Sequence, residues 1–485
     1  MARRLDPRAL TGRMLQSFIT VNQPTKISKA RGATRREFLK KTTLAGAALA
    51  ASHNLFKTPV YGQTQPPAPG NAVGANNRIV VGYIGVGFQG VAHIDLQKQF
   101  AQANNIAQAA VCDVSAFRLA AAKAKIGGNC KDFARLEQLL EQKDIDAVTI
   151  STVDQWHADA AIAALQAGKH VYLEKPMARY LGEAFALYDT VKKNPKLVFQ
   201  IGSQGCSDAK WSKAAELVKG GKVGKLVMGL ASYMRNNDKG EWNTPPFVPA
   251  AWMVPGDCDW VKWQGHVKNQ IPYDAEHYIR WRKFYPYCAG PLGDLCPHTL
   301  HPLLLATGNP EFPTRVVCLG QKPILTDKNT PNALERDCPE DIQLLAEFPS
   351  GYAVMMAAGT INQVGLDPVI RGHKATMWMA GNRVKLNPEP EFADDIDPLT
   401  IDNIQPGEAI ETHEANWFDC IRGKNGITTP NANADLAIRV QTVLSLAEMS
   451  NRLNMMCLFD EKTRQVTNGD GKEVPAITYG TLPKS

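Results

Sequence analysis

Short apolar runs alternate with helix-like segments over the first half of the chain. Apolar runs bounded by turn residues are typical of buried strands, whereas apolar positions three and four apart indicate helices. Regular alternation of the two predicts a doubly wound parallel sheet covered by helices. The expected strands span 79–84, 107–113, 145–150, 170–174 and 197–201, and the expected helices span 91–102, 115–125, 136–141, 158–167 and 181–192.

The pattern changes near Gly202. Beyond it, β-type runs dominate and predict a mostly antiparallel sheet. The tryptophan-rich segment 240–292 is long for a loop within a compact domain, so we expect it to be functional. The fold class is therefore α/β, with a Rossmann domain at 78–201 and, at 202–485, an α+β domain for substrate binding and oligomerisation. The second domain's expected strands are 225–234, 314–319, 341–348, 352–360 and 374–386, and its expected helices are 209–219 and 432–453.

The first expected strand runs directly into a glycine turn of the form G-x-G-x-x-G. Gly85 allows the tight turn, Gly87 lets the backbone approach a pyrophosphate, and Gly90 lets the next helix pack closely. The N–H groups at the start of that helix would face the phosphates. Phe88 and Gln89 lie inside the motif and are expected to contact the cofactor. A glycine-rich turn without a ligand is the alternative.

An acid follows at the spacing that a dinucleotide site requires. Asp113 ends the second expected strand, about twenty residues past the glycines, where a carboxylate accepts hydrogen bonds from ribose hydroxyls. The same carboxylate repels the 2′-phosphate of NADP, so NAD is the expected cofactor. Arg118 lies nearby and weakens this preference.

A basic leader precedes the predicted fold. Residues 34–40, Thr-Arg-Arg-Glu-Phe-Leu-Lys, are typical of a twin-arginine export signal, and the apolar stretch 42–51 is too short to span a bilayer. We therefore expect residues 1–62 to be a signal region, residues 63–77 to be a flexible linker, and the mature protein to be periplasmic. A basic disordered arm is the alternative.

The charge distribution supports this division. Residues 1–62 contain twelve Lys and Arg against two Asp and Glu, a net charge of +10, and the whole chain carries +7, which leaves about −3 for residues 63–485. That remainder does not favour nucleic acid or an anionic membrane as a partner. The ten cysteines form no C-x-x-C pair, so no metal site is expected.

Three polar motifs stand where a parallel sheet would bind a ligand or where a helix begins. Segments 151–157 and 174–176 each follow an expected strand, and open α/β sheets bind ligands at the carboxyl ends of their strands. In segment 293–301, Asp294 and His298 are four apart, on one face of a helix. The candidate residues are Ser151, Thr152, Trp156, His157, Glu174 and Lys175 for the cofactor, and Lys175, Asp294 and His298 for catalysis.

Together with the glycine turn, these motifs resemble the glucose–fructose oxidoreductase, inositol dehydrogenase and rhizopine-catabolism (Gfo/Idh/MocA) family from about residue 78 to residue 453. The resemblance implies a Lys–Asp–His site beside a nicotinamide, formed here by Lys175, Asp294 and His298. A histidine suits removal of a hydroxyl proton, and a lysine suits polarisation of the same oxygen. Which of the two removes the proton stays open.

The substrate candidates are less specific. His301 stands where many members of that family carry an acid, and it is expected either to bind substrate or to support a neighbour. Gln204, Arg280 and Trp281 are further candidates, although core packing or oligomer contact explains the aromatic residues equally well.

The expected protein is an exported NAD-dependent oxidoreductase of a sugar, polyol or glycoside. It would keep and recycle its cofactor and form a homodimer or tetramer. The alternatives are a glycosidase that oxidises its sugar transiently with NAD, and a noncatalytic sugar- or cofactor-binding protein.

Overall fold

The computed structural model describes residues 77–236, 256–323 and 334–479, all within one unit that spans Val60–Ser485. The expected signal region, 1–62, lies outside the described residues, as does most of the expected linker. No helix among the described residues has the length and apolar composition to cross a membrane.

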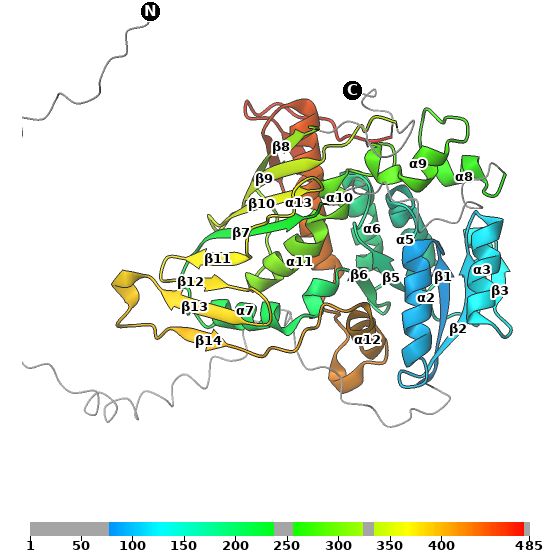
Figure 1. The fold of residues 1–485 in the computed structure, drawn as a ribbon, viewed down its shortest axis with the longest axis horizontal. Helices are drawn as coiled ribbons and strands as arrows, with labels where there is room; N and C mark the ends of the chain where they lie inside the picture. Colours follow the sequence, from blue (N-terminus) through cyan, green and yellow to red (C-terminus); the bar gives the residue numbers. More distant parts are fainter. Residues whose placement is uncertain (1–76, 237–255, 324–333, 480–485) are drawn as a thin grey trace, which may run out of the picture. The chain divides into compact units, whose positions relative to one another are not determined.

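The first half is the expected doubly wound sheet. Its six strands are all parallel and follow the order β3-β2-β1-β4-β5-β6, so the order reverses beside β1 (Figure 1). Such a reversal is where open α/β sheets bind ligands. The strands are β1 (Ile79–Ile84), β2 (Ile106–Cys112), β3 (Lys131–Phe133), β4 (Ala147–Ile150), β5 (His170–Glu174) and β6 (Phe199–Gly202), and the helices are α2 (Phe88–Phe100), α3 (Ala116–Ile126), α4 (Leu136–Leu140), α5 (His157–Gln166) and α6 (Leu181–Lys193).

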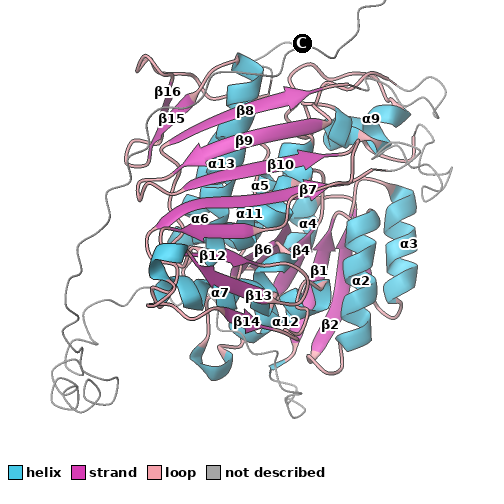
Figure 2. Ribbon diagram, turned by 60° about the vertical axis from the view of Figure 1, so that its left-hand side comes forward, coloured by secondary structure: helices cyan, strands magenta, loops and turns pink. Residues whose placement is uncertain are grey.

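The second half contains the expected large sheet, which has ten strands in the order β14-β13-β12-β11-β7-β10-β9-β8-β15-β16 (Figure 2). Only β7 (Leu226–Met234) and β10 (Ala353–Gly359) pair in parallel among these described strands. The remaining strands are β8 (Arg315–Gln321), β9 (Asp341–Glu347), β11 (Val369–Gly372), β12 (Ala375–Trp378), β13 (Val384–Pro388), β14 (Leu399–Ile401), β15 (Cys457–Asp460) and β16 (Gln465–Thr467).

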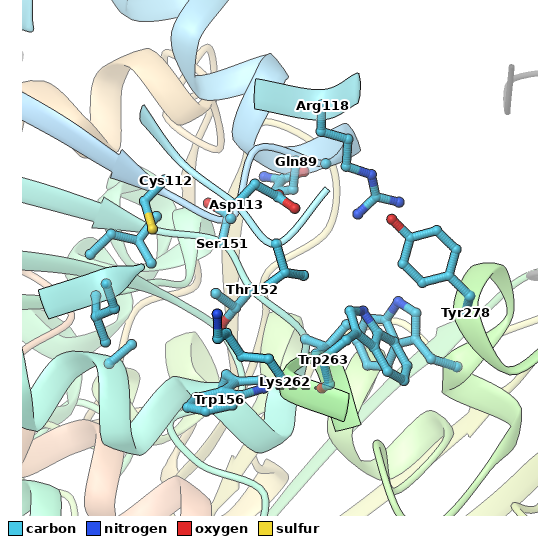
Figure 3. Close-up of a pocket in the computed structure, with 18 of the residues that line it drawn as sticks. Gln89, Cys112, Asp113, Arg118, Ser151, Thr152, Trp156, Lys262, Trp263 and Tyr278 are labelled. Atoms are coloured by element: carbon cyan, nitrogen blue, oxygen red, sulfur yellow. Dashed lines mark hydrogen bonds between the residues drawn. The ribbon is translucent and has the colours of Figure 1, made fainter. Parts of the chain in front are cut away.

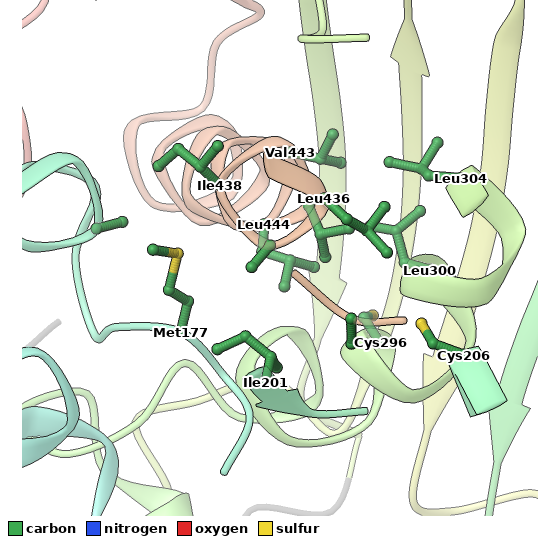
Figure 4. Packing of buried hydrophobic residues seen from close by; sticks show 14 of the residues in the cluster. Met177, Ile201, Cys206, Cys296, Leu300, Leu304, Leu436, Ile438, Val443 and Leu444 are labelled. Carbon is green, nitrogen blue, oxygen red and sulfur yellow. The ribbon is translucent and has the colours of Figure 1, made fainter. Parts of the chain in front are cut away.

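Two helices fill the space between the large sheet and the Rossmann half. Leu300 and Leu304 of α11 (Cys296–Ala306) pack against Leu436 and Val443 of α13 (Ala434–Leu453), and Ile201 of β6 lies beside them (Figure 4). This continuous apolar core joins the two halves, so elements of the second half are held rigidly against the carboxyl edge of the parallel sheet.

The large sheet carries apolar side chains on both faces of β8 and β9. In β8, Val316 and Cys318 are buried, whereas Val317 and Leu319, which point the other way, are 43% and 59% exposed. Leu345 on the neighbouring β9 is also exposed. Alternation along a strand normally places polar side chains on a solvent-facing side, so this face carries an unusual apolar patch.

Strands β3, β11, β14, β15 and β16 were not expected from the sequence, and three further segments also differ from the expectation. The single strand expected at 374–386 is a hairpin, β12 and β13, because Gly381 has a positive φ of 58° and turns the chain. The tryptophan-rich segment contains the short helices α8 (Trp260–Gln264) and α9 (Ala275–Ile279). Helix α12 (Ile410–Ile421) was not expected, and it packs on α2, β5 and β6 of the Rossmann half although it lies between β14 and β15 of the large sheet in sequence.

Candidate functional site

The glycine turn has the geometry that its spacing predicts. Gly85 has a φ of +80°, which side-chain-bearing residues rarely adopt. A Cβ on Gly90 would lie 2.1 Å from the Gly85 carbonyl oxygen, so only glycine lets α2 approach the turn this closely. Asp113 Oδ2 accepts a hydrogen bond of 2.8 Å from the Val86 N–H and thereby fixes the turn against the end of β2. The acid and the glycines thus form one structural unit.

A cleft of about 560 Å³ opens at this turn (Figure 3). The volume is within the range of cofactor pockets. Ser151 Oγ and Thr152 Oγ1 are buried in the cleft wall and make no hydrogen bond to any described residue. Two such hydroxyls beside a glycine turn fit a dinucleotide, whose ribose and phosphate groups would complete their hydrogen bonds. The expected cofactor residues that line the cleft are Gly85, Gly87, Phe88, Gln89, Asp113, Ser151, Thr152 and Trp156.

A segment of the second half, residues 256–279, crosses to the side of this cleft where α3 begins. We call it the strap. Asp257 accepts hydrogen bonds from the Ser115 hydroxyl (2.6 Å) and the Phe117 N–H (3.0 Å), and Cys258 forms a β-bridge with Ser115. Asp257 therefore caps the start of α3 from outside the Rossmann domain.

The strap is also fixed on the opposite side of the cleft. The Trp263 carbonyl accepts hydrogen bonds from Trp156 Nε1 (3.0 Å) and Gln155 Nε2 (3.2 Å). Tyr278, near the end of the strap, faces Arg118 of α3, and the Arg118 guanidinium carbon lies 4.7 Å from the centre of the tyrosine ring (Figure 3). Side chains from both halves of the chain thus line the cleft, and the tryptophan-rich segment contributes part of its wall.

At the other end of the site, Lys175 and Asp294 form an ion pair. Lys175 Nζ lies 2.9 Å from Asp294 Oδ1 and also donates to the Asp294 carbonyl at 2.7 Å. Arg282 Nε donates to the same carboxylate oxygen at 2.8 Å. Burial alone raises the pKa of Asp294, but the charges of Arg282 and Lys175 outweigh burial and hold the pKa well below its ordinary value. Asp294 is therefore a permanent anion that orients two cations.

His298 lies close to this cluster and is neutral. Burial, together with the nearby charge of Lys175, lowers the pKa of His298 to about 3. Its ring stacks on Tyr233 of β7 at a centroid distance of 5.1 Å. The same burial and charge disfavour the imidazolium, so His298 is a hydrogen-bond acceptor of low basicity, and the base role that the sequence left open between His298 and Lys175 stays open.

The sequence predicted that Asp294 and His298 lie on one continuous helix, but in the structure they belong to two. Asp294 ends α10 (Pro291–Asp294), and α11 begins at Cys296. Pro297 has no N–H, so it cannot donate to the Gly293 carbonyl, and the helix breaks there. Asp294 consequently pairs with Lys175 and Arg282.

The predicted substrate residues lie in different surroundings. Trp281 lines the cleft, and its ring lies 4.2 Å from the Arg282 guanidinium carbon. His301 is 1% exposed, and its Nδ1 lies 2.8 Å from the Pro297 carbonyl oxygen, four residues earlier in the chain. Gln204 and Arg280 are also buried, against Tyr172 and Glu276 respectively. Burial leaves Trp281 as the candidate with the most direct access to a ligand.

Two expected cofactor residues instead contact protein groups. His157 is 1% exposed, with Nδ1 2.6 Å from the Pro176 carbonyl oxygen and Nε2 3.1 Å from the Thr152 carbonyl oxygen. Glu174 is 5% exposed and accepts hydrogen bonds from Gln89 Nε2 at 2.9 Å and from the Lys175 N–H at 3.2 Å. Both side chains connect the loops of the site, a role that the sequence did not indicate.

The sequence analysis missed Arg282, Tyr278 and Lys262, which all line the cleft. Arg282 also contacts Asp294, so this arginine connects the cleft to the Lys175 cluster. Its position in the run 280–283, Arg-Trp-Arg-Lys, was a signal for a cationic site, but spacing alone did not separate Arg282 from Arg280.

Fold and site together define an NAD-binding Rossmann domain joined to a domain with a large, mostly antiparallel sheet. Residues 79–202 match the model of the GFO_IDH_MocA oxidoreductase family that describes its NAD-binding Rossmann fold. This match supports the family resemblance for the Rossmann half and shows that the first half is of the NAD-binding class.

Curated relatives and solved structures agree with this class. The chain is 30% identical over 167 residues to inositol 2-dehydrogenase of Salmonella typhimurium, which is 34% of this chain and 49% of that protein. It is 29% identical over 228 residues to a glycosyl hydrolase family 109 protein of Saccharopolyspora erythraea, or 43% and 47% of the two chains. The chain thus spans about half the length of the curated relatives it matches.

The fold likeness extends further along the chain. Levoglucosan dehydrogenase, solved in complex with NADH and levoglucosan, superposes with a TM-score of 0.57 at 18% identity and covers 78% of this chain and 98% of its own. At this identity the likeness shows the fold alone. The likeness of fold therefore extends beyond the Rossmann half into the second half of the chain.

Proposed function

We propose that this protein is an NAD-dependent oxidoreductase that acts on a sugar, polyol or glycoside and retains its cofactor through turnover. The observation that carries the proposal is the Lys175–Asp294–Arg282 cluster, because Arg282 connects it directly to the dinucleotide cleft. The inositol 2-dehydrogenase relative and the levoglucosan dehydrogenase neighbour support a polyol or sugar substrate.

The residues suggest how a carbinol would be oxidised. A bound nicotinamide would accept the hydride from the carbinol carbon. The Lys175 ammonium would donate a hydrogen bond to the carbinol oxygen and stabilise negative charge as it develops there. Neutral His298 would accept a hydrogen bond from the hydroxyl, but a pKa of about 3 makes it a weak base, so the choice of proton acceptor between His298 and Lys175 stays open. Asp294 holds Lys175 in place.

NAD is the proposed cofactor in preference to NADP. Asp113 presents its carboxylate at the cleft and would accept hydrogen bonds from ribose hydroxyls while it repels a 2′-phosphate. The strap supports retention of the cofactor, because its attachments to residues 114–117 and to Trp156 enclose the cleft on both sides.

A second candidate is a glycoside hydrolase that oxidises, eliminates and reduces within one turnover. The family 109 relative favours it, and so does a retained cofactor, because hydride returned to the sugar needs no external electron acceptor. Lys175 and His298 would serve the redox steps of either reaction.

One experiment separates the two candidates. The purified protein is incubated with a panel of aryl glycosides, free sugars and polyols, while released phenol and the absorbance of reduced nicotinamide are followed together. If reduced nicotinamide accumulates and a second carbonyl compound then reoxidises it, the result would support the oxidoreductase. Phenol release without net reduction would support the hydrolase. Neither signal, from protein with bound cofactor, would contradict both.

We also propose that the protein is exported through the twin-arginine pathway to the periplasm, on the support of the motif at 34–40 and the basic leader. Replacement of Arg35 and Arg36 by lysine should retain the protein in the cytoplasm in a fractionation assay. Periplasmic recovery of that variant would contradict this route.

The apolar face that includes Val317, Leu319 and Leu345 supports a homo-oligomer. We expect Leu319→Lys to lower the oligomeric mass in light scattering, and an unchanged mass would exclude this face as the interface.

A further inference from the structure

A buried polar network connects the Lys175 loop to helix α12. His93 of α2 has its Nε2 2.9 Å from Glu174 Oε1 and its Nδ1 2.7 Å from Glu414 Oε1. His93 and Glu414 are fully buried, and Glu174 is 5% exposed. None of the motifs in the sequence analysis included His93 or Glu414, and the proposed chemistry does not use them.

The distribution of charge in this network follows from the hydrogen bonds. A neutral imidazole has one N–H, whereas both nitrogens of His93 face carboxylates, so His93 must be an imidazolium to satisfy both. Burial lowers the pKa of His93, but the two carboxylates outweigh burial and raise the pKa to about 10. Burial raises the pKa of Glu174, but His93 and Lys175 bring it down to about 2.

The two carboxylates are not equivalent. Burial raises the pKa of Glu414, and its Oε2 makes no hydrogen bond to any described residue. Glu174, by contrast, accepts from three donors: His93, Gln89 and the Lys175 N–H. The tight ion pair is therefore His93 with Glu174, and Glu414 fixes the second nitrogen of the ring.

Glu174 joins two parts of the proposed site. Gln89 belongs to the glycine turn, and Lys175 follows Glu174 directly in the chain. Gly202 packs on the same carboxylate so closely that a Cβ there would lie 2.9 Å from it. Movement of this carboxylate would therefore disturb the cofactor turn and the lysine loop together.

We propose that His93 is a positioning residue: by holding Glu174 through an ion pair anchored on Glu414, it keeps the glycine turn and the Lys175 loop in register for the cofactor. This inference rests on the proposed function, which assigns the cleft to NAD and Lys175 to catalysis. It gives α12, which lies far from both motifs in sequence, a defined role in the site.

The test compares His93→Gln with His413→Gln. His413 is a matched control, because it is also fully buried and has both ring nitrogens engaged, by Ser207 Oγ at 2.6 Å and the Ile201 carbonyl oxygen at 2.8 Å. Neither substitution replaces a residue that we place against the cofactor. Cofactor-free protein is titrated with NAD by calorimetry between pH 7 and pH 5, and unfolding is measured in parallel.

We expect His93→Gln to weaken NAD binding about tenfold to a hundredfold at pH 7, the scale set by a misplaced catalytic loop. Without the imidazolium, the pKa of Glu174 rises, so binding weakens further as the pH falls to 5, while wild type stays level over that interval. His413→Gln should lose stability and keep both the affinity and the level profile.

The other titratable groups around this pair are Tyr83, Tyr172, Lys175, His298, Glu414 and His413. Burial raises the pKa of Tyr83 well above its ordinary value and, with the charge of Lys175, lowers that of His298 to about 3, so neither group titrates between pH 5 and pH 7. Burial raises the pKa of Tyr172 far above this interval and lowers that of His413 to about 4. Glu414→Gln keeps an oxygen for His93 Nδ1 and should show the level wild-type profile, which would exclude Glu414 as the titrating group. A sloping profile in this variant would count against the assignment to Glu174.

Equal losses of affinity in His93→Gln and His413→Gln, with level profiles in both, would overturn the proposal and leave His93 a packing residue. The binding assay requires no turnover. Failure of the oxidoreductase and hydrolase assays would therefore contradict the proposed function without deciding the role of His93.

Discussion

The two ends of the site differ in whether their polar side chains already have hydrogen-bond or ion-pair partners within the protein. At the nucleotide end, the hydroxyls of Ser151 and Thr152 are buried and make no hydrogen bond to the described residues. At the lysine end, Lys175, Asp294 and Arg282 satisfy one another at 2.8–2.9 Å. A site of the first kind is completed by its ligand, whereas a site of the second kind is built before the ligand arrives. We therefore expect changes at the nucleotide end to act on binding and changes at the lysine end to act on rate.

The largest effect is expected for Lys175→Met. The variant loses the cation that would stabilise charge on the substrate oxygen, and the rate of nicotinamide reduction should fall about 10²- to 10⁴-fold. Stopped-flow absorbance with an active substrate measures this rate. Bound cofactor per protein should remain near wild type, because the change lies at the lysine end.

Lys169→Met is the matched control. Lys169 is also buried, and its Nζ donates to the carbonyls of Gln142 and Ile145, away from the cleft. This variant should lose stability and keep its rate. If Lys175→Met instead releases the cofactor at an unchanged rate per loaded site, the division between the two ends is wrong.

At the nucleotide end, Gly90→Ala is expected to weaken NAD binding about tenfold to a hundredfold. The new Cβ would meet the Gly85 carbonyl oxygen at 2.1 Å, and overpacking against backbone costs about 1–3 kcal/mol. Equilibrium titration of cofactor-free protein checks this. Gly182→Ala in α6 has open space for its Cβ and should leave the affinity unchanged. Equal affinities for the two variants would show that the turn tolerates displacement.

The nucleotide end was predicted from sequence because its information is local. Gly85, Gly90 and Asp113 lie on consecutive elements, and each is required by backbone geometry that spacing alone reveals. The strand and helix alternation of the Rossmann half was confirmed for the same reason, since its apolar runs are short, regular and bounded by turns.

The rest of the site depends on contacts that spacing does not contain. Lys175 and Asp294 were paired through a family resemblance, and Arg282 joins them from a different local element, twelve residues before Asp294. Helix α12 was missed because His413 and Glu414 are polar residues on its buried side, which interrupts the apolar periodicity. In a single sequence, polar residues that are buried against each other give the same pattern as polar residues that face solvent.

A smaller effect, about tenfold, is expected for Asp113→Asn on the preference for NAD over NADP. Loss of the negative charge removes the repulsion of a 2′-phosphate, and the amide oxygen can still accept from the Val86 N–H. The amide nitrogen would then face the Ser115 N–H, which donates to Oδ1 at 2.9 Å in the wild type, so both affinities should fall and the ratio is the quantity to compare. Parallel titrations with NAD and NADP measure the ratio. Asp146→Asn is the control, because Asp146 likewise accepts from a backbone N–H of β1, that of Val80, at 2.8 Å. An unchanged ratio in Asp113→Asn would place the specificity elsewhere.

The smallest expected effect tests whether the strap slows release of the cofactor from the nucleotide end. Asp257→Ala removes the acceptor for the Ser115 hydroxyl and the Phe117 N–H, a loss on the scale of a helix cap, and should raise the cofactor release rate about threefold to tenfold. The rate of reduction at the lysine end should not change.

Asp208→Ala matches that substitution away from the cleft. Asp208 caps α7 (Ala209–Lys219) by accepting from the Lys210 N–H at 3.0 Å, so its loss costs a cap without loosening the strap. Release is followed by exchange of bound cofactor against a labelled excess. Faster release in Asp257→Ala alone would assign retention to the strap. Equal release in both would mean that the open hydroxyls and the glycine turn hold the cofactor without the strap, and the nucleotide end would then consist of Rossmann residues alone.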